Sequence, residues 1–165
     1  KKIPTHIFLQ GGVGSFPGSI CSYFWEKFQS KNIKIIIVES EHAPCLIQSA
    51  KNNKMTSVSV NQETMMAGLS CGEPSMLAWE ILSQGADDFV TISDQAIPST
   101  MRMLSENNPP IEAGESSVAG LVALTEIMKN KSIASKLELN SSSLVLLFGT
   151  EGATDPAIYN SIIKD

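Results

Sequence analysis

The sequence lacks the features that mark membrane, secreted and nucleic-acid-binding proteins. No apolar run approaches the roughly 20 residues that a helix needs to span a bilayer, and the two opening lysines are not followed by the apolar stretch of a signal peptide. The three cysteines are an odd, widely spaced set, which favours reduced thiols in a cytoplasmic protein. The formal net charge is -5 and the basic residues form no cluster, so neither nucleic acid nor an anionic membrane is an expected partner.

Residue types that bind metals or form nucleophile–base pairs are also scarce. The sequence has two histidines. His42 and Cys45 lie close together, but two isolated ligands do not make a zinc site, so no metal is expected. His6 falls inside an apolar run and is interpreted as a structural residue. A serine hydrolase is not indicated, because the sequence contains no G-x-S-x-G motif.

The 165 residues, 42% of them hydrophobic and 18% charged, have the composition of one globular domain. Apolar runs predict strands at residues 5–10, 33–39, 88–93 and 143–149, with a weaker candidate at 55–60. Helix-sized segments with amphipathic spacing lie at residues 15–29, 43–52, 73–84, 98–106, 116–129 and 156–163. This alternation predicts an α/β fold, with a mostly parallel sheet of about four or five strands and helices on both faces.

A glycine-rich loop, Gln10-Gly11-Gly12-Val13-Gly14-Ser15, joins the first predicted strand to a helix. Glycines let several backbone N–H groups converge on one anion, and the helix N-terminus adds its positive dipole end. The loop therefore predicts a phosphate site, with a plain tight turn as the alternative. A dinucleotide fingerprint would need a third glycine where Pro17 stands. Glu39, at the end of the second predicted strand, keeps a nicotinamide-nucleotide domain open as an alternative.

Three further polar or small-residue stretches stand at predicted loops, at residues 64–74, 111–117 and 148–155. The first has two glycines that would let the backbone run close under a flat ligand. The second contains Ser116, which is also a natural helix cap. The third carries Thr150, whose hydroxyl could bond a ring nitrogen, while Thr154 and Asp155 are interpreted as capping residues.

Taken together, these stretches resemble those of fold-type II pyridoxal-phosphate enzymes, and most closely the diaminopropionate ammonia-lyase family. The specific motifs are Ala-Gly-Leu-x-Cys-Gly-Glu-Pro at residues 67–74 and Thr-Glu-Gly-x-Thr-Asp at residues 150–155. The resemblance implies the large-domain portion of a tryptophan synthase β-like fold, with pyridoxal 5'-phosphate as the cofactor. It covers nearly the whole chain.

The resemblance also implies roles for individual residues. The cofactor phosphate would be held by the loop residues Gly11, Gly12, Val13, Gly14 and Ser15. Thr150 would bond the pyridine nitrogen, Gly68 and Leu69 would lie beside the ring, and Glu115 would line the same pocket. The lysine that forms the Schiff base lies upstream of the glycine loop in this family, and no lysine here has that context. Residues 1–165 are therefore expected to form a single cofactor-binding domain, an incomplete C-terminal part of a longer enzyme that is inactive alone.

The resemblance implies that the longer enzyme converts 2,3-diaminopropionate to pyruvate and ammonia by α,β-elimination. Its substrate would be a small amino acid, and family members imply a homodimer. A serine/threonine dehydratase with the same cofactor is the alternative within this class. A non-catalytic nucleotide-binding domain of Rossmann type is the alternative outside it.

Overall fold

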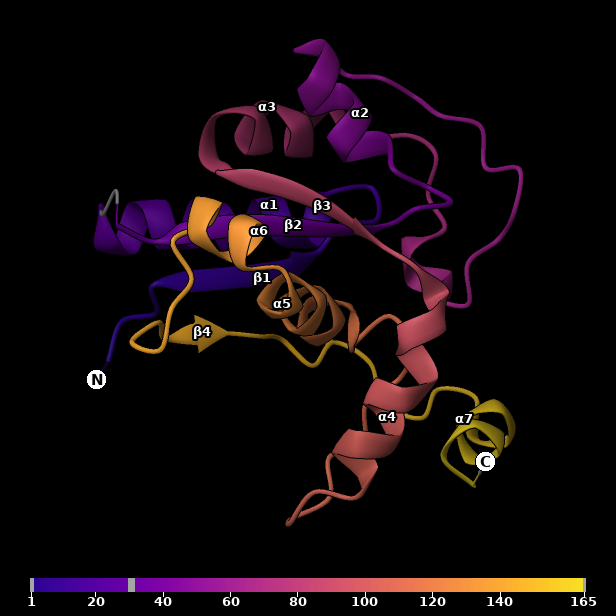
Figure 1. Ribbon diagram of the computed structural model, residues 1–165. Helices are drawn as coiled ribbons and strands as arrows, with labels where there is room; N and C mark the ends of the chain where they lie inside the picture. The colour runs from indigo at the N-terminus through magenta and orange to yellow at the C-terminus, as the bar shows by residue number, and fades with distance from the viewer. Residues whose placement is uncertain (1, 30–31, 165) are drawn as a thin grey trace.

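The computed structural model describes residues 2–29 and 32–164, and it shows four parallel strands in the order β3-β2-β1-β4 with helices around them (Figure 1). The strands are β1 (His6–Gln10), β2 (Lys34–Ser40), β3 (Asp88–Ile92) and β4 (Val145–Leu146). The α/β fold with a parallel sheet is thus confirmed. Among the described residues, no helix combines the length and the apolar character that crossing a membrane requires.

The edge strand β4 is shorter than its apolar run predicts. Only His6 with Val145 and Ile7 with Leu146 pair across β1 and β4, whereas β1 and β2 pair over five positions. Beyond Leu146 the chain leaves the ladder and crosses the end of the sheet as an irregular segment. The weaker strand prediction at residues 55–60 was wrong, because these residues are extended but join no sheet.

Helices cover both faces of the sheet, as the alternating pattern predicted. The helices are α1 (Ser15–Phe28), α2 (Cys45–Asn52), α3 (Met76–Gly85), α4 (Ile97–Ser105), α5 (Ala119–Lys129), α6 (Lys131–Lys136) and α7 (Pro156–Lys164). Two short 3-10 turns, η1 (Ala67–Leu69) and η2 (Asp94–Ala96), stand at loop positions. The sequence did not reveal α6, which has only six residues and begins at a cap made by the Asn130 side chain.

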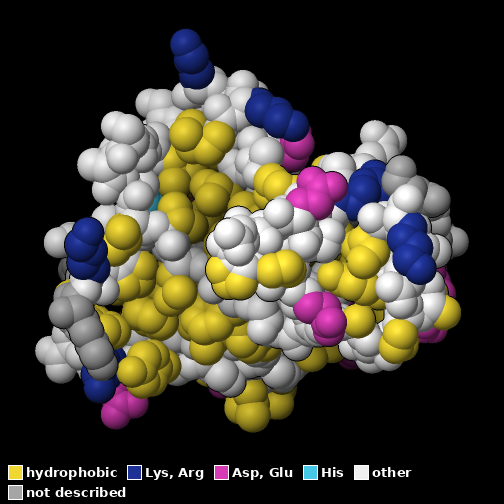
Figure 2. Space-filling model, turned by 90° about the horizontal axis from the view of Figure 1, so that it is seen from below, with side chains coloured by type: hydrophobic (Ala, Val, Ile, Leu, Met, Phe, Trp, Pro, Cys, Tyr) yellow, Lys and Arg dark blue, Asp and Glu magenta, His cyan; other side chains and the backbone are white. Residues whose placement is uncertain are grey.

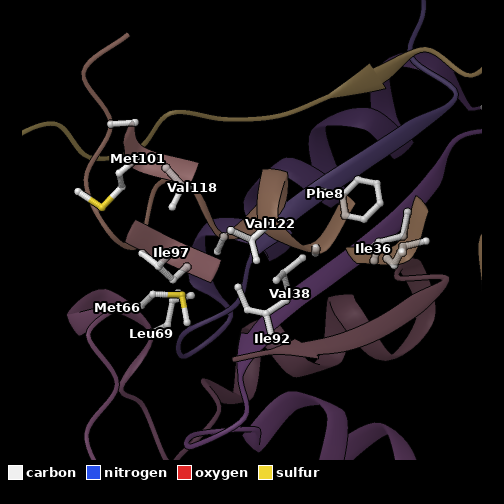
Figure 3. Close-up of a cluster of buried hydrophobic side chains, with 14 of the residues drawn as sticks. Phe8, Ile36, Val38, Met66, Leu69, Ile92, Ile97, Met101, Val118 and Val122 are labelled. Carbon is white, nitrogen blue, oxygen red and sulfur yellow. The ribbon is translucent and has the colours of Figure 1, made fainter. Parts of the chain in front are cut away.

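The alternation of side chains along the strands divides the core into two clusters. Ile7, Leu9 and Ile35 point toward α1, α2 and α3, where they pack with Cys21, Phe24, Leu46 and Leu82. Phe8, Ile36 and Val38 point to the other face, where Val122 of α5 and residues from the loops contact them (Figure 3). Burial on both faces explains why the strands show continuous apolar runs.

The carboxyl ends of the strands meet at one edge of the sheet. The central strand β1 has β2 on one side and β4 on the other. The chain leaves β1 through α1 on one face, whereas α5 lies on the opposite face. A parallel sheet has its crevice where consecutive connections diverge in this way. The functional site is therefore expected just beyond Gln10.

Candidate cofactor-binding site

A cavity of about 540 Å³ opens at this edge of the sheet. Four segments that are distant in sequence form its wall: the end of β1, the η1 turn, the loop before α5 and the segment that follows β4. The lining residues are Gln10, Gly11, Phe16, Gly68, Leu69, Ser116, Thr150, Glu151, Gly152 and Thr154. Of the described residues, those that line the cavity include no lysine.

The glycine loop holds one wall of the site and leaves several backbone donors free. Gly11 donates to the oxygen of Val38 at 2.8 Å, and Gly14 donates to the oxygen of Gly11 at 3.0 Å. The N–H groups of Gly12, Val13 and Ser15 donate to no group within the described part of the chain. These three donors and the start of α1, which has no side-chain cap, are suited to an anion. The structure thus offers a phosphate a ready cradle.

Gly12 is required by both its conformation and its surroundings. Its φ of 57° lies in the left-handed region, which side chains rarely adopt. A Cβ atom there would lie 3.0 Å from the backbone oxygen of Gly68. The loop therefore packs directly against the η1 turn, so the two walls of the cavity fix each other.

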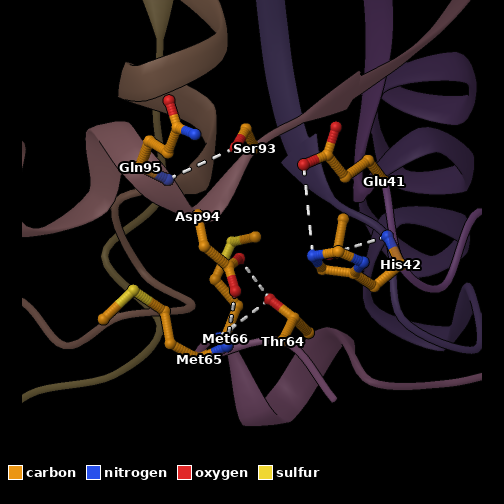
Figure 4. Close-up of polar contacts among 9 residues, drawn as sticks. Glu41, His42, Thr64, Met65, Met66, Ser93, Asp94 and Gln95 are labelled. Carbon is orange, nitrogen blue, oxygen red and sulfur yellow. Dashed lines mark hydrogen bonds and ion pairs between the residues drawn. The ribbon is translucent and has the colours of Figure 1, made fainter. Parts of the chain in front are cut away.

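The η1 turn is anchored by the segment before it and by its middle residue. Before it, Asp94 accepts hydrogen bonds from the Thr64 hydroxyl at 2.5 Å and from the Met65 N–H at 2.8 Å (Figure 4). Within it, the Gly68 N–H donates to the Ser116 hydroxyl oxygen at 3.1 Å. Asp94 is the first residue of η2 and stands two residues beyond the end of β3, so a carboxylate near the end of one strand positions the floor of the cavity.

Carboxylates also hold the segment at residues 149–154, which carries Thr150. The Ser116 N–H donates to Oε2 of Glu151 at 2.9 Å, and the Ala153 N–H donates to Oε1 of Glu112 at 3.0 Å. The Gly114 N–H bonds to the backbone oxygen of Glu151 at 3.0 Å. This exchange of bonds clamps the loop before α5 to the segment after β4, and Thr150 is left exposed at the cavity.

Glu39 is a buried carboxyl directly beneath the glycine loop. Its side chain is 1% exposed, and its two oxygens accept from the N–H groups of Leu46 at 2.8 Å and Ile47 at 2.7 Å. Burial raises the pKa of Glu39 to about 7, although these hydrogen bonds act in the opposite direction. Both oxygens are engaged by the start of α2, so Glu39 is not available to a ribose. The nicotinamide-nucleotide alternative depended on Glu39 to bind a ribose, so these hydrogen bonds remove the observation that supported it.

The neighbouring thiol of Cys45 is buried, and its ionisation is disfavoured. Cys45 is fully buried, and burial together with the charge of Glu39 raises the pKa of its thiol to about 12. Its sulfur lies 3.6 Å from the Gly12 oxygen. Among the described residues, no group of three or more His, Cys, Asp or Glu side chains could hold a metal ion.

Comparison with protein families supplies the decisive observation: the model of the family described as "Pyridoxal-phosphate dependent enzyme" matches residues 1–149. The chain belongs to this family. Pyridoxal phosphate is thereby confirmed as the cofactor expected from the sequence motifs.

Individual relatives narrow the position of the chain within the pyridoxal-phosphate enzymes. A diaminopropionate ammonia-lyase of Salmonella typhimurium is 40% identical over 99% of this chain and 43% of its own length. The solved structure of the Escherichia coli diaminopropionate ammonia-lyase with an aminoacrylate–PLP azomethine intermediate has a TM-score of 0.88 and 35% identity, over 98% of this chain and 42% of that chain. A probable D-serine dehydratase of Acinetobacter baylyi is 25% identical over 93% of this chain and 36% of its own length. The chain thus spans less than half the length of these relatives.

The residues proposed from the motifs fall in two groups and one exception in this chain of the pyridoxal-phosphate family. Gly11, Gly68, Leu69 and Thr150 line the cavity. The other loop residues form the anion cradle beside it, although Gly11 and Gly14 use their own N–H groups within the protein. Glu115 is half-buried and does not line the cavity, whereas its neighbour Ser116 does.

Sequence reasoning missed the cavity-lining residues Gln10, Phe16, Ser116, Glu151, Gly152 and Thr154. Gln10 gave a signal, since it is a buried polar residue at the end of an apolar strand. Ser116 was interpreted as a helix cap, but its hydroxyl accepts from Gly68 instead. Asp155 does cap α7, because its carboxylate accepts from the N–H groups of Ala157 and Ile158.

The residues present fit pyridoxal phosphate. The three unbonded N–H groups of the loop match the oxygens of a phosphate dianion. The cavity is large enough for a pyridine ring, and Thr150 offers a hydroxyl across from the loop.

Proposed function

We propose that this chain holds pyridoxal phosphate with the cofactor phosphate on Gly12, Val13 and Ser15 and the ring over η1. The observation that carries the proposal is that the N–H groups of Gly12, Val13 and Ser15 have no partner among the described residues, in a loop whose residue Gly11 lines the same cavity as Thr150. Gly68 and Leu69 would form the floor beneath the ring, and the Thr150 hydroxyl would bond the pyridine nitrogen. Glu115 precedes the lining residue Ser116 and would stand at the margin of the same pocket.

We propose further that the chain is the C-terminal cofactor-holding part of a longer enzyme whose upstream part supplies the Schiff-base lysine. The face seen from below carries a broad hydrophobic area with charged side chains mostly at its margins (Figure 2). The short edge strand β4 lies on this side of the molecule, and Leu144 beside it is 37% exposed. Large hydrophobic areas are typical of surfaces that other protein covers. The upstream part is the proposed occupant.

The proposed reaction of the complete enzyme consumes 2,3-diaminopropionate and water and yields pyruvate and two ammonia molecules. Pyridoxal phosphate held at this site would supply the electron withdrawal that makes the Cα hydrogen of the substrate acidic. This chain would hold the cofactor between three walls, because its loop, floor and Thr150 segment contact one another. A neutral hydroxyl at the ring nitrogen keeps the ring less electron-withdrawing than a charged partner would, which suits elimination.

The experiment uses the purified complete protein. We expect a yellow chromophore, and we expect diaminopropionate to release pyruvate, measured with lactate dehydrogenase, and ammonia in a ratio of one to two. A protein that gains no chromophore with added pyridoxal phosphate would refute the cofactor assignment. The chain of residues 1–165 alone should bind the cofactor weakly and should not turn over substrate, and lyase activity in it would contradict the proposed division.

A serine/threonine dehydratase remains the second candidate, since the D-serine dehydratase is similar over most of the chain. The two functions differ in the leaving group, which is an amine for diaminopropionate and a hydroxyl for serine. Comparing kcat/KM for diaminopropionate with that for serine on the complete protein separates them. Higher kcat/KM for serine would favour the dehydratase.

We also propose that the complete enzyme is a cytoplasmic homodimer that acts on a small amino acid. The reduced cysteines Cys21, Cys45 and Cys71 are consistent with a cytoplasmic compartment. Light scattering of the purified complete protein at several concentrations tests the dimer, and a monomer at all of them would contradict it.

A further inference from the structure

Gln10 forms more hydrogen bonds than a residue that merely ends a strand. Its side chain is 5% exposed and lines the cavity. The Nε2 atom donates to the backbone oxygen of Ser117 at 3.0 Å and to that of Phe148 at 2.8 Å. Both partners are carbonyl oxygens and accept only, so the amide must face them with its nitrogen. Gln10 therefore ties the end of β1 to the loop before α5 and to the segment after β4.

The same nitrogen reaches the residue that faces the cofactor ring. It lies 3.5 Å from Oγ1 of Thr150, the longest of its three hydrogen bonds. An amide group has two N–H hydrogens, so one of them is shared between two acceptors. The Thr150 oxygen accepts from Gln10, and its single proton is then free to point into the cavity that Thr150 lines.

The oxygen of the Gln10 amide makes no hydrogen bond that would explain a glutamine at this position, whereas the nitrogen does. Oε1 is buried and has no hydrogen-bond partner among the described residues. A buried acceptor without a donor destabilises a fold, and an apolar side chain of similar length would avoid this. The glutamine is thus justified by the bonds that its nitrogen donates.

We propose that Gln10 is a positioning residue that makes Thr150 a hydrogen-bond donor toward the pyridine nitrogen of bound pyridoxal phosphate. This inference rests on the proposed function. A ring nitrogen that receives a hydrogen bond from a neutral hydroxyl stays unprotonated. Gln10 sets this polarity through Thr150 and does not itself contact the ring nitrogen.

The test loads the complete protein with pyridoxal phosphate labelled with 15N in the ring and records the nitrogen resonance by NMR. In the wild type we expect an unprotonated, hydrogen-bonded nitrogen. Gln10→Met removes the donor without adding charge, so the Thr150 hydroxyl is no longer held with its proton toward the ring. The resonance should therefore move downfield, part of the way to that of Thr150→Val, in which the hydroxyl itself is absent. Gln10→Glu gives the Thr150 proton an acceptor, which reverses the hydroxyl and should move the resonance far upfield as the ring nitrogen becomes protonated.

Gln84→Glu is the matched control, because it adds the same charge on α3, where the exposed Gln84 side chain donates to the Glu80 backbone oxygen at 2.9 Å. It should leave the resonance unchanged. The inference is overturned if Gln10→Met keeps the wild-type resonance while Thr150→Val moves it, or if the wild-type ring nitrogen is protonated. Should Gln10→Met not retain the cofactor, the upfield move in Gln10→Glu decides. A wild-type protein that takes up no cofactor refutes the proposed function instead, and this inference falls with it.

Discussion

The buried carboxyl of Glu39 should make the protein less stable as the pH rises from 4.5 to about 7. Burial raises the pKa of Glu39 to about 7 in the folded chain, from an ordinary value of 4.5. The folded state therefore holds this proton more tightly than the unfolded state does. Between the two pKa values the folded state binds more protons, so the free energy of unfolding decreases with increasing pH. Below pH 4.5 both states are protonated and the effect vanishes.

The size of the effect follows from the separation of the two pKa values. Raising the pKa from 4.5 to about 7 corresponds, at about 1.4 kcal/mol per pKa unit, to about 3 kcal/mol of stability lost across this range. The assay is urea unfolding of the complete protein without cofactor, followed by circular dichroism between pH 4.5 and pH 8. The decisive quantity is the difference between the wild type and Glu39→Gln, because other titrating groups cancel in it.

At pH 4.5, where Glu39 is neutral, the glutamine variant should be less stable than the wild type, since its amide has one oxygen for the two N–H groups of Leu46 and Ile47. This deficit should shrink as the pH rises, because the wild type alone loses stability. Only the pH dependence of the difference is therefore diagnostic. Glu41→Gln serves as the control, because Glu41 is 49% exposed and lies two residues further along the chain. A difference that stays flat from pH 4.5 upward would refute the argument that burial dominates over the hydrogen bonds to α2.

Three further substitutions test the walls of the cavity. Asp94→Ala removes two acceptors from the segment before η1, so it should lower the free energy of unfolding by about 3 kcal/mol and weaken cofactor uptake in a fluorescence titration. Asp94→Asn should lower the free energy of unfolding by less. Equal losses in the two variants would contradict the role given to the Asp94 carboxylate. Gly114→Ala places a Cβ atom 2.5 Å from a backbone oxygen and should cost about 1–3 kcal/mol in urea unfolding, with wild-type stability as the contrary result. Gly12→Ala places a side chain on a backbone with a φ of 57°, and the resulting strain should weaken cofactor affinity by about tenfold. Gly149→Ala should leave the affinity unchanged, because its Cβ atom would lie 3.7 Å from the nearest side-chain atom.

The sheet could be predicted from the sequence because its strands are buried on both faces. Continuous apolar runs such as Ile35–Val38 allow few alternatives, and three of the four strands appear within about two residues of their predicted bounds. The end of β4 could not be predicted, since Leu147 and Phe148 have strand-like side chains but pack against helices without pairing. Pairing depends on the neighbouring chain, which local composition does not contain.

The free backbone N–H groups of the glycine loop could also be predicted, because closely spaced glycines between a strand and a helix leave such groups without internal partners. The hydrogen bonds that assemble the cavity could not. Asp94 and Thr64 are 30 residues apart, and Ser116 and Glu151 are 35 apart, so no local pattern links them. Residues such as Ser116 and Asp155 look alike in sequence as helix caps, and only the packing of distant loops separates their roles.

The brevity of β4 has a consequence for how the site can change. With two residues in the ladder, the following segment is retained by side-chain bonds from Gln10, Glu112 and Glu151 rather than by a strand pairing. Such a segment can open locally while the rest of the sheet stays intact, so its amides should exchange with solvent far sooner than those of β1 and β2. Insertions and substitutions there would accordingly reshape the pocket at little risk to folding, which gives this scaffold a route to new substrates.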